Sequence, residues 1–153
     1  MDRHPLPLIQ DIFDQLGGAT IFTTLDLKQG YHQLPVHPES IEKTAFACHL
    51  GLFEWSRMPM GVSCGPPVFQ REMQKAMAGL LGVCCLVYLD NLVIFSQDPK
   101  EHVRHVELVL ERLRQYGLSL KRSKCTFAVP VVELLGFVIS AHGISANLTK
   151  WQP

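Results

Sequence analysis

Two aspartates, Asp26 and Asp90, have the residue type and the setting to carry chemistry. Asp26 closes a β-branched and aromatic run, and Asp90 lies between two apolar runs at the tip of an expected hairpin. If the two strands are neighbours in one sheet, both carboxylates meet at one edge, where their repulsion favours a bound divalent cation. Mg²⁺ takes hard oxygen ligands and keeps waters or substrate phosphates in its shell, so such a site suits phosphoryl transfer. The alternative is a purely structural role, in which Asp26 caps a helix and Asp90 makes an Asx turn.

The elements that must position these carboxylates follow from apolar periodicity and turn residues. A strand over 20–27 should end near Asp26, and the pair Asp90-Asn91 should form a hairpin turn, because both side chains tolerate a left-handed backbone. Strands alternating with helices and hairpins predict an α+β fold, in which helices cover one face of an antiparallel sheet and leave the other face open for a ligand. The other expected elements are a helix over 8–16 after Pro5 and Pro7, a hairpin over 43–58 around Gly51, helices over 66–82 and 99–116, and short strands over 118–139.

The two longer helices should each bury one apolar face. The first opens at Pro66 and closes at Gly82, and the second has Asp98 as its N-cap. His102 and His105 share a face of the second helix, but without a third ligand nearby they are expected to be surface residues rather than a zinc site. The expected buried residues are Phe69, Met73, Met77 and Leu80 in the first helix, and Val103, Val106, Leu110 and Leu113 in the second.

The composition is that of a globular protein without a strong electrostatic bias. Apolar residues make up 47% of the 153 residues, and 14 Lys and Arg balance 14 Asp and Glu. No global positive field therefore indicates a nucleic-acid partner. The five cysteines form no CxxC pair and indicate buried thiols in a reducing, intracellular compartment, cytoplasmic or nuclear. The longest apolar run, 80–88, is too short to cross a bilayer, so neither a membrane anchor nor a targeting signal is expected.

Several short motifs follow one another at compatible spacings. They are Leu25-Asp26-Leu27-Lys28-Gln29-Gly30-Tyr31, Pro35-Val36-His37-Pro38, Arg57-Met58-Pro59-Met60-Gly61, Phe69-Gln70, Tyr88-Leu89-Asp90-Asn91 and Leu134-Leu135-Gly136-Phe137. In this order they resemble the palm region of reverse transcriptases from gypsy-type (Ty3-like) LTR retrotransposon polyproteins. The resemblance runs from about Pro5 to Lys150. It implies one reverse-transcriptase-like domain over 1–153, a palm with partial fingers, and the activity of an RNA-directed DNA polymerase.

The resemblance also implies roles for particular residues. Asp26 and Asp90 would hold two catalytic Mg²⁺ (or Mn²⁺) ions, with Asn91 beside them. A primer 3′-hydroxyl would attack the α-phosphate of a deoxynucleoside triphosphate, and Tyr31 would leave no room for a 2′-hydroxyl. The implied partners are an RNA or DNA template with its primer and the deoxynucleoside triphosphates. The implied nucleotide-binding residues are Leu27 (through its carbonyl), Tyr31, Met60, Gly61, Gln70 and Lys124, and the implied primer contacts are Leu135, Gly136 and Phe137.

The chain departs from the family pattern at its expected catalytic centre. Asn91 stands where the family has the second aspartate of its Tyr-x-Asp-Asp box. An amide oxygen ligates Mg²⁺ weakly and brings no charge, so catalysis is expected to be impaired by orders of magnitude. Cys64-Gly65 replaces the usual Asn-Ala pair, and Met60 replaces an aromatic residue. Upstream fingers strands, a thumb and a ribonuclease H region are also expected to be missing.

Two other functions stay open on the sequence. One is a catalytically inactive retrotransposon relic, or a host-adopted protein, that keeps the fold and binds nucleic acid or another partner. The other is a ferredoxin-like RNA-binding sheet, which would need Phe22, Tyr88 and Phe95 exposed on its strands.

The basic residues between Arg112 and Lys124 form two groups with different expected roles. Arg112 and Arg114 suit the negative end of a helix dipole, where cations are favoured. Residues 121–124 carry three further cations, for which contact with nucleic-acid phosphates is the preferred interpretation.

Overall fold

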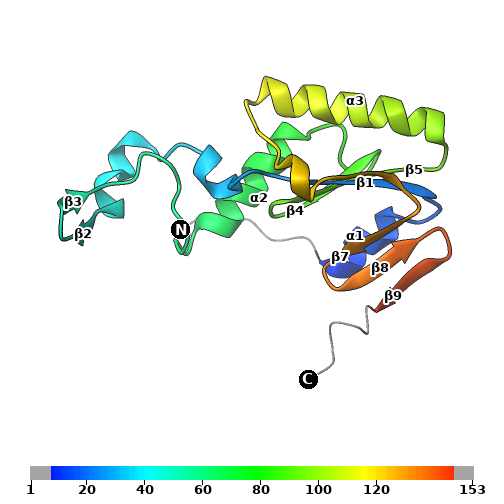
Figure 1. Ribbon diagram of the computed structural model, residues 1–153, viewed down its shortest axis with the longest axis horizontal. Coiled ribbons are helices and arrows are strands. Elements are labelled where there is room, and N and C mark those ends of the chain that lie inside the picture. Colours follow the sequence, from blue (N-terminus) through cyan, green and yellow to red (C-terminus); the bar gives the residue numbers. More distant parts are fainter. Residues whose placement is uncertain (1–7, 147–153) are drawn as a thin grey trace.

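The centre of the fold is a four-stranded antiparallel sheet in the order β4-β5-β1-β6 (Figure 1). The structure is a computed structural model and describes residues 8–146, so the features expected at Pro5, Pro7 and Lys150 lie outside the described residues. The central strands β1 and β5 are separated in the chain by three short 3₁₀ turns, a hairpin, a helix and strand β4, yet they lie side by side. The bounds of the strands are Ile21–Asp26 for β1, Cys85–Tyr88 for β4, Asn91–Ser96 for β5 and Thr126–Val129 for β6.

Side chains on the central strands alternate between the two faces of the sheet. The β1–β5 ladder runs from Ile21 opposite Ser96 to Asp26 opposite Asn91. Because successive residues of a strand point to opposite faces, Leu25 belongs to the core on one side and Phe22 to the core on the other. The sheet is therefore buried on both faces.

Helices α2 (Gly65–Ala76) and α3 (Pro99–Gln115) cover one face, as the periodicity predicted. Met73 of α2 and Leu113 of α3 pack in one cluster with Leu25 of β1. Burying each such side chain contributes roughly 1.5–3 kcal/mol, so this core holds both helices against the strands that carry the aspartates. The N-cap of α3 is confirmed, since the Asp98 carboxylate accepts hydrogen bonds from the N–H groups of Lys100 (2.9 Å) and Glu101 (3.2 Å).

The other face of the sheet is covered instead of open. Helix α1 and a three-stranded sheet, β7-β8-β9, pack there, and the Phe13 and Phe137 rings meet edge to face at 4.9 Å (Figure 1). Phe22 and Phe95 are buried beneath them, which removes the exposed aromatic face that a ferredoxin-like RNA-binding sheet would need. The bounds are Ile9–Gln15 for α1, Val131–Leu134 for β7, Phe137–Ser140 for β8 and Gly143–Ala146 for β9.

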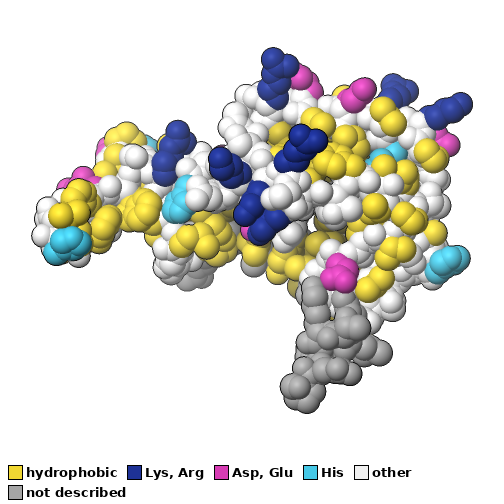
Figure 2. Space-filling model, viewed as in Figure 1, with side chains coloured by type: hydrophobic (Ala, Val, Ile, Leu, Met, Phe, Trp, Pro, Cys, Tyr) yellow, Lys and Arg dark blue, Asp and Glu magenta, His cyan; other side chains and the backbone are white. Residues whose placement is uncertain are grey.

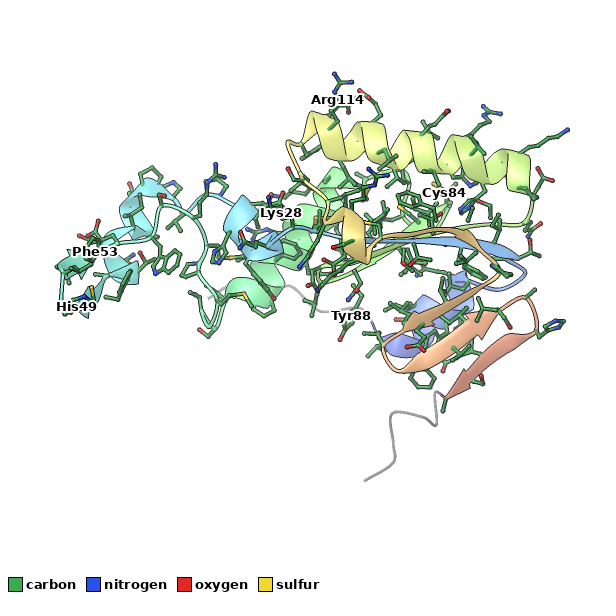
Figure 3. The ribbon with its side chains drawn as sticks, viewed as in Figure 1. Lys28, His49, Phe53, Cys84, Tyr88 and Arg114 are labelled. Carbon is green, nitrogen blue, oxygen red and sulfur yellow. The ribbon has the colours of Figure 1, made fainter. Side chains whose placement is uncertain are left out.

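A hairpin of two short strands projects from one end of the molecule and carries His49 and Phe53 near its tip (Figure 3). Strands β2 (Phe46–Cys48) and β3 (Gly51–Phe53) confirm the predicted hairpin, although it is shorter than expected and Gly51 pairs with Cys48 inside the ladder. All six of its strand residues are exposed, and hydrophobic side chains are visible over this projection (Figure 2). Three short 3₁₀ turns, η1 (Gly30–Gln33), η2 (Pro38–Ser40) and η3 (Glu42–Thr44), connect β1 to the projection.

Two helix predictions are wrong in detail. Helix α2 ends at Ala76 rather than at Gly82, because residues 77–82 form turns in which Gly79 and Gly82 have φ values of 82° and 72°. The buried face of α3 is rotated from the predicted one, so that Val103 is 59% exposed while Val109 is fully buried. The apolar pattern alone does not identify the buried face of α3, because that face includes a histidine.

His102 is buried, contrary to its expected surface position. Its Nε2 lies 2.8 Å from the Thr23 hydroxyl, and its Nδ1 lies 2.9 Å from the Ser96 hydroxyl, which also lies 2.8 Å from Nδ1 of His105. These partners satisfy the polar atoms of the imidazole, so a histidine can occupy the interface between α3 and the sheet.

Candidate functional site

One end of the central sheet brings together the residues expected to do chemistry. Asp26 is the last residue of β1, and Asn91 is the first residue of β5 and its direct partner in the ladder. Asn91 also pairs with Tyr88 of β4, so the turn between these strands consists of Leu89 and Asp90. The predicted turn at Asp90-Asn91 is therefore wrong by one residue. The left-handed residue is Leu89, with φ of 54°, because Asn91 is needed in the ladder.

Gln70 of α2 holds this turn through both ends of its side-chain amide. Its Nε2 donates a hydrogen bond to the carbonyl of Val87 (3.0 Å), and its Oε1 accepts one from the N–H of Leu89 (2.7 Å). The side chain is fully buried, and a positive φ is strained for a leucine. Gln70 therefore lies behind the turn that carries Asp90 and stabilises its conformation.

Asp26 and Asp90 line the same pocket, which has a volume of about 410 Å³. This is the convergence expected for two aspartates on neighbouring strands. Leu27 contributes only its backbone, because its side chain is buried in the core. The loop after β1 contributes Lys28, Gln29, Gly30, Tyr31 and His32 to the lining. Met60 contributes as well, and Lys121 and Lys124 come from just before and within the 3₁₀ turn η4 (Arg122–Lys124).

The loop after β1 approaches the Asp90 turn closely. A Cβ atom at Gly30 would lie 2.9 Å from Cζ of Phe69 and 3.6 Å from Cβ of Asp90, so only glycine fits there without a shift of its neighbours. The neighbouring Tyr31 ring packs 5.0 Å from the Phe69 ring. Burial, and then the negative charge of Asp90, raises the pKa of Tyr31 above its ordinary value of 10.0, so the phenol in this wall stays neutral.

Three lysines share the pocket with the two carboxylates. Nζ of Lys124 lies 3.6 Å from Oδ2 of Asp26, and the backbone N–H of Lys121 donates a 2.8 Å hydrogen bond to the carbonyl of Asp26. Lys28 also lines the pocket, and in Figure 3 it lies on the α3 side of the same end of the sheet. Three lysines and two aspartates thus line the pocket, which suits a polyanion such as a triphosphate.

A second cavity of about 170 Å³ adjoins the pocket on the side of β7. It is lined by Asp26, Asn91 and Lys124 together with Glu133 and Leu134 of β7. Asp26 and Lys124 therefore belong to both hollows. The β7–β8 hairpin reaches the aspartate through these two β7 residues.

The residues expected to contact a primer lie just beyond that contact. Leu135 and Gly136 form the turn between β7 and β8, with φ values of 53° and 82°. Leu135 and Phe137 pack against the core of α1 and Phe22, as does Tyr88, which lies on that side of the sheet in Figure 3. None of the three predicted primer residues is part of the lining of the 410 Å³ pocket.

The residues expected to form the nucleotide pocket are partly brought together. Met60 is 70% exposed and lines both the main pocket and a smaller hollow of about 230 Å³. Gly61, with φ of 86°, lines only the second of these, which it shares with Tyr31. Met60 and Gly61 therefore form the rim of the site beside Tyr31.

Sequence reasoning missed Gln33, which fastens the loop after β1 to Ser119 in the segment between α3 and η4. Its Nε2 donates hydrogen bonds to the carbonyls of Lys28 (2.6 Å) and Ser119 (2.9 Å), and its Oε1 accepts one from the N–H of Ser119 (2.6 Å). No local signal could have found it, because Ser119 is 86 positions away. Arg112 lies in the last turn of α3, as expected, but its guanidinium is not simply solvated there: it donates hydrogen bonds to the carbonyls of Ala76 and Ala78 at the end of α2.

The acidic side chains that line the pocket are the carboxylates of Asp26 and Asp90. Within residues 8–146, no three His, Cys, Asp or Glu side chains are grouped so as to hold a metal ion, and the two carboxylates stand without a third. Two carboxylates and a backbone carbonyl fit one hard divalent cation that takes further ligands from water or phosphate. In the described part of the chain, no helix has the length and apolar character needed to span a membrane.

The chain is similar to known proteins along most of its length. Residues 1–139 match the family model described as "Reverse transcriptase (RNA-dependent DNA polymerase)". The chain is 40% identical over 149 residues to the retrovirus-related Pol polyprotein from transposon 297 of Drosophila melanogaster, covering 97% of the chain and 14% of that protein. It is 38% identical to the Pol polyprotein from transposon gypsy of the same organism, with the same coverage, and 37% identical to the transposon Tf2-7 polyprotein of Schizosaccharomyces pombe, covering 93% of the chain and 11% of that protein.

Solved structures show the same fold. The foamy viral protease-reverse transcriptase in complex with RNA/DNA hybrid matches 94% of this chain and 19% of that chain, with a TM-score of 0.85 at 24% identity. The prototype foamy virus protease-reverse transcriptase, as a CSH mutant, matches 90% of this chain and 19% of that chain, with a TM-score of 0.79 at 28% identity. The chain thus spans about one seventh of the length of the transposon 297 and gypsy polyproteins that it matches and about one fifth of these two chains.

Proposed function

The chain belongs to the reverse transcriptase family, and we propose that its pocket is the catalytic centre of an RNA-directed DNA polymerase that works at a strongly reduced rate. One observation carries the proposal: Asp26 and Asp90 line a single pocket at the end of the sheet, and Asn91 faces Asp26 across the ladder. Two carboxylates in a pocket that lysines also line suit the transfer of a nucleotide to a primer 3′-hydroxyl.

A divalent cation, Mg²⁺ or Mn²⁺, is the cofactor of this proposal. The carboxylates of Asp26 and Asp90 would hold it, with the backbone carbonyl of Leu27 as a further oxygen ligand. When bound, such an ion would activate the attacking hydroxyl and stabilise charge on the pyrophosphate that leaves. Asn91 supplies no charge for a second ion, which is the reason for the reduced rate.

The other residues of the pocket bind and orient the nucleotide. The ammonium groups of Lys121 and Lys124 would neutralise the triphosphate. The Tyr31 ring, held against Phe69, would lie under the sugar and exclude a 2′-hydroxyl, so that deoxynucleotides are preferred. Met60 and Gly61 would border the base and the template, and Gln70 would act through the turn that carries Asp90.

The partners of the proposal are a primer and a template. The β7–β8 hairpin would position the primer terminus, with Glu133 and Leu134 nearest to Asp26 and with Leu135, Gly136 and Phe137 at the following turn. A solved neighbour binds an RNA/DNA hybrid and another binds dsDNA, which supports a nucleic-acid duplex as the ligand. Residues 1–153 would act as a palm with partial fingers, and other regions of a polyprotein would grip the duplex. The free thiols, Cys48 among them at the surface, suit an intracellular compartment.

A second candidate function is favoured by the same substitution. With Asn91 in place of a carboxylate and more lysines than aspartates in the pocket, the chain could bind nucleic acid without catalysis, as a relic or a host-adopted protein. The two candidates differ in whether extension activity can be measured at all.

Primer extension separates them. The chain is assayed by itself and also spliced into the transposon 297 polyprotein in place of the matching stretch, so that the regions that hold the duplex are supplied. We expect slow Mg²⁺-dependent extension that rises by orders of magnitude in Asn91→Asp and is lost in the double variant Asp26→Asn, Asn91→Asp. Equal rates in wild type and Asn91→Asp, or activity that survives loss of Asp26, would refute the proposed mechanism. No extension by the wild type or by Asn91→Asp, with duplex binding retained, would favour the noncatalytic function.

A further inference from the structure

The Asp26 carboxylate already has a cation beside it. Nζ of Lys124 lies 3.6 Å from its Oδ2, and both side chains line the main pocket and the adjoining cavity. The Asp26 side chain is 21% exposed and that of Lys124 is 57% exposed, so the lysine can leave the pair without unfolding its surroundings.

The backbone places this lysine at the end of β1. The N–H of Lys121 donates a 2.8 Å hydrogen bond to the carbonyl of Asp26, and the N–H of Lys124 donates one of the same length to the carbonyl of Lys121. A bridge between Leu27 and Leu120 fastens the same two segments. The Lys124 backbone is therefore tied to Asp26 by a short chain of hydrogen bonds, and only its side chain is free to move.

Asn91 determines what charge this ammonium meets. A residue directly opposite in the ladder lies on the same face as Asp26, with Cβ atoms about 4.5–5.5 Å apart. Because Asn91 is neutral, Asp26 is the only carboxylate of this cross-strand pair, and the Lys124 ammonium lies beside it; Glu133 of β7 is a further carboxylate in the lining of the adjoining cavity.

We propose that Lys124 is the resident cation of Asp26 and competes with a divalent ion for that carboxylate. This inference rests on the proposed function, because it concerns the metal of the same site. When the ion enters, the ammonium is released toward the pocket, where it can meet the phosphates of a nucleotide. The competition lowers the affinity of the site for a divalent ion until a polyanion draws Lys124 away.

The size of the effect follows from electrostatics. An ammonium about 4 Å from a divalent ion, in water-like surroundings, weakens its binding by roughly tenfold or more. A cation elsewhere on the pocket wall has a smaller effect, because the interaction falls with distance and is screened by salt. Removal of Lys124 should therefore raise the affinity for a divalent ion more than removal of another lysine of the same pocket does.

Manganese binding tests this without any need for catalysis. Mn²⁺ is titrated into the 153-residue chain and free ion is measured by electron paramagnetic resonance. Lys124→Gln should bind Mn²⁺ about tenfold more tightly than wild type, or gain binding where wild type has none, and Lys124→Arg should stay near wild type. The matched control is Lys28→Gln, which removes the same charge from the pocket wall, and it should change the affinity by less than about threefold.

The outcomes separate this inference from the proposed function. Equal affinities in wild type and Lys124→Gln, or equal gains in Lys124→Gln and Lys28→Gln, would overturn the competition. Asp26→Asn, made in the Lys124→Gln background, tells whether the bound ion uses Asp26. If binding does not depend on Asp26, the proposed metal site itself is wrong. If binding depends on Asp26 but not on Lys124, only the competition is wrong.

Discussion

Asp26 and Asn91 are paired across the β1–β5 ladder, immediately beside the turn residue Asp90. Their side chains therefore lie on one face of the sheet as nearest cross-strand neighbours. An aspartate at this position would complete a cluster of three carboxylates, whereas the amide relieves the repulsion within it. We therefore expect the substitution that impairs the proposed chemistry to stabilise the metal-free fold relative to an aspartate.

Asn91→Asp should make stability depend on divalent ions. Like charges directly opposite in a ladder destabilise a sheet, so the variant should lose about 0.5–1 kcal/mol of unfolding free energy in EDTA. Mg²⁺ should restore this loss, because an ion that binds only the folded state stabilises it. Urea denaturation with and without Mg²⁺ measures both effects. The control is His142→Asp, which adds the same charge at an exposed turn and should show neither effect. If the stability of Asn91→Asp does not depend on Mg²⁺, the cross-strand arrangement is contradicted.

Gln70→Leu should loosen the turn that carries Asp90. The substitution removes both hydrogen bonds of the amide and leaves the Leu89 N–H and the Val87 carbonyl without their partner, which costs about 2–4 kcal/mol in a buried setting. Urea denaturation gives the loss of stability, and amide hydrogen exchange at Leu89 reports the turn directly. Gln115→Leu, on the exposed side of α3, is the control. Unchanged exchange at Leu89 would show that Gln70 does not hold the turn.

Gly30→Ala tests the close approach of the loop to the Asp90 turn. The added methyl group would lie 2.9 Å from the Phe69 ring, so the variant should be destabilised by about 1–3 kcal/mol. Thermal unfolding is the measurement. The control is Gly17→Ala, where the nearest atom to the new Cβ is the Asp14 carbonyl oxygen at 3.5 Å and φ is not positive. Equal melting temperatures for the two variants would contradict the packing described for this loop.

His102 should make the fold sensitive to acid. Burial, and then the nearby His105, lowers the pKa of His102 below its ordinary value of 6.5. The folded chain therefore binds this proton more weakly than the unfolded chain, so stability is complete above pH 6.5 and falls as the pH drops toward the folded-state pKa. Urea denaturation from about pH 8 to pH 5 should show this slope in wild type and in His142→Asn. His102→Gln should have a shallower slope, and an identical slope in all three proteins would contradict the assignment.

Much of the framework was predictable because its signals are local. The strand that ends at Asp26, the apolar face of α2 through Met73 and the N-cap at Asp98 each depend on a few neighbouring residues. The convergence of Asp26 and Asp90 needed one further assumption, that their strands are neighbours, and the β1–β5 pairing confirms it.

The features that could not be predicted depend on contacts between distant segments. His102 looks like a surface residue until Thr23, 79 positions away, is placed beside it. The covered second face depends on α1 packing against strands from the other end of the chain, as Phe13 does against Phe137. The left-handed turn residue is Leu89, because Asn91 pairs with Tyr88 in the ladder. The residue preferences of turns alone do not reveal this pairing.

The proposed function requires that the carboxylates of Asp26 and Asp90 hold one divalent ion together. The most direct test is a crystal of the chain grown with Mn²⁺ and a deoxynucleoside triphosphate, measured at the manganese absorption edge. We expect an anomalous peak within about 2–2.6 Å of an oxygen from each carboxylate, with Lys124 turned away from Asp26. A nucleotide bound with no such peak, or a manganese ion that contacts neither aspartate, would contradict it.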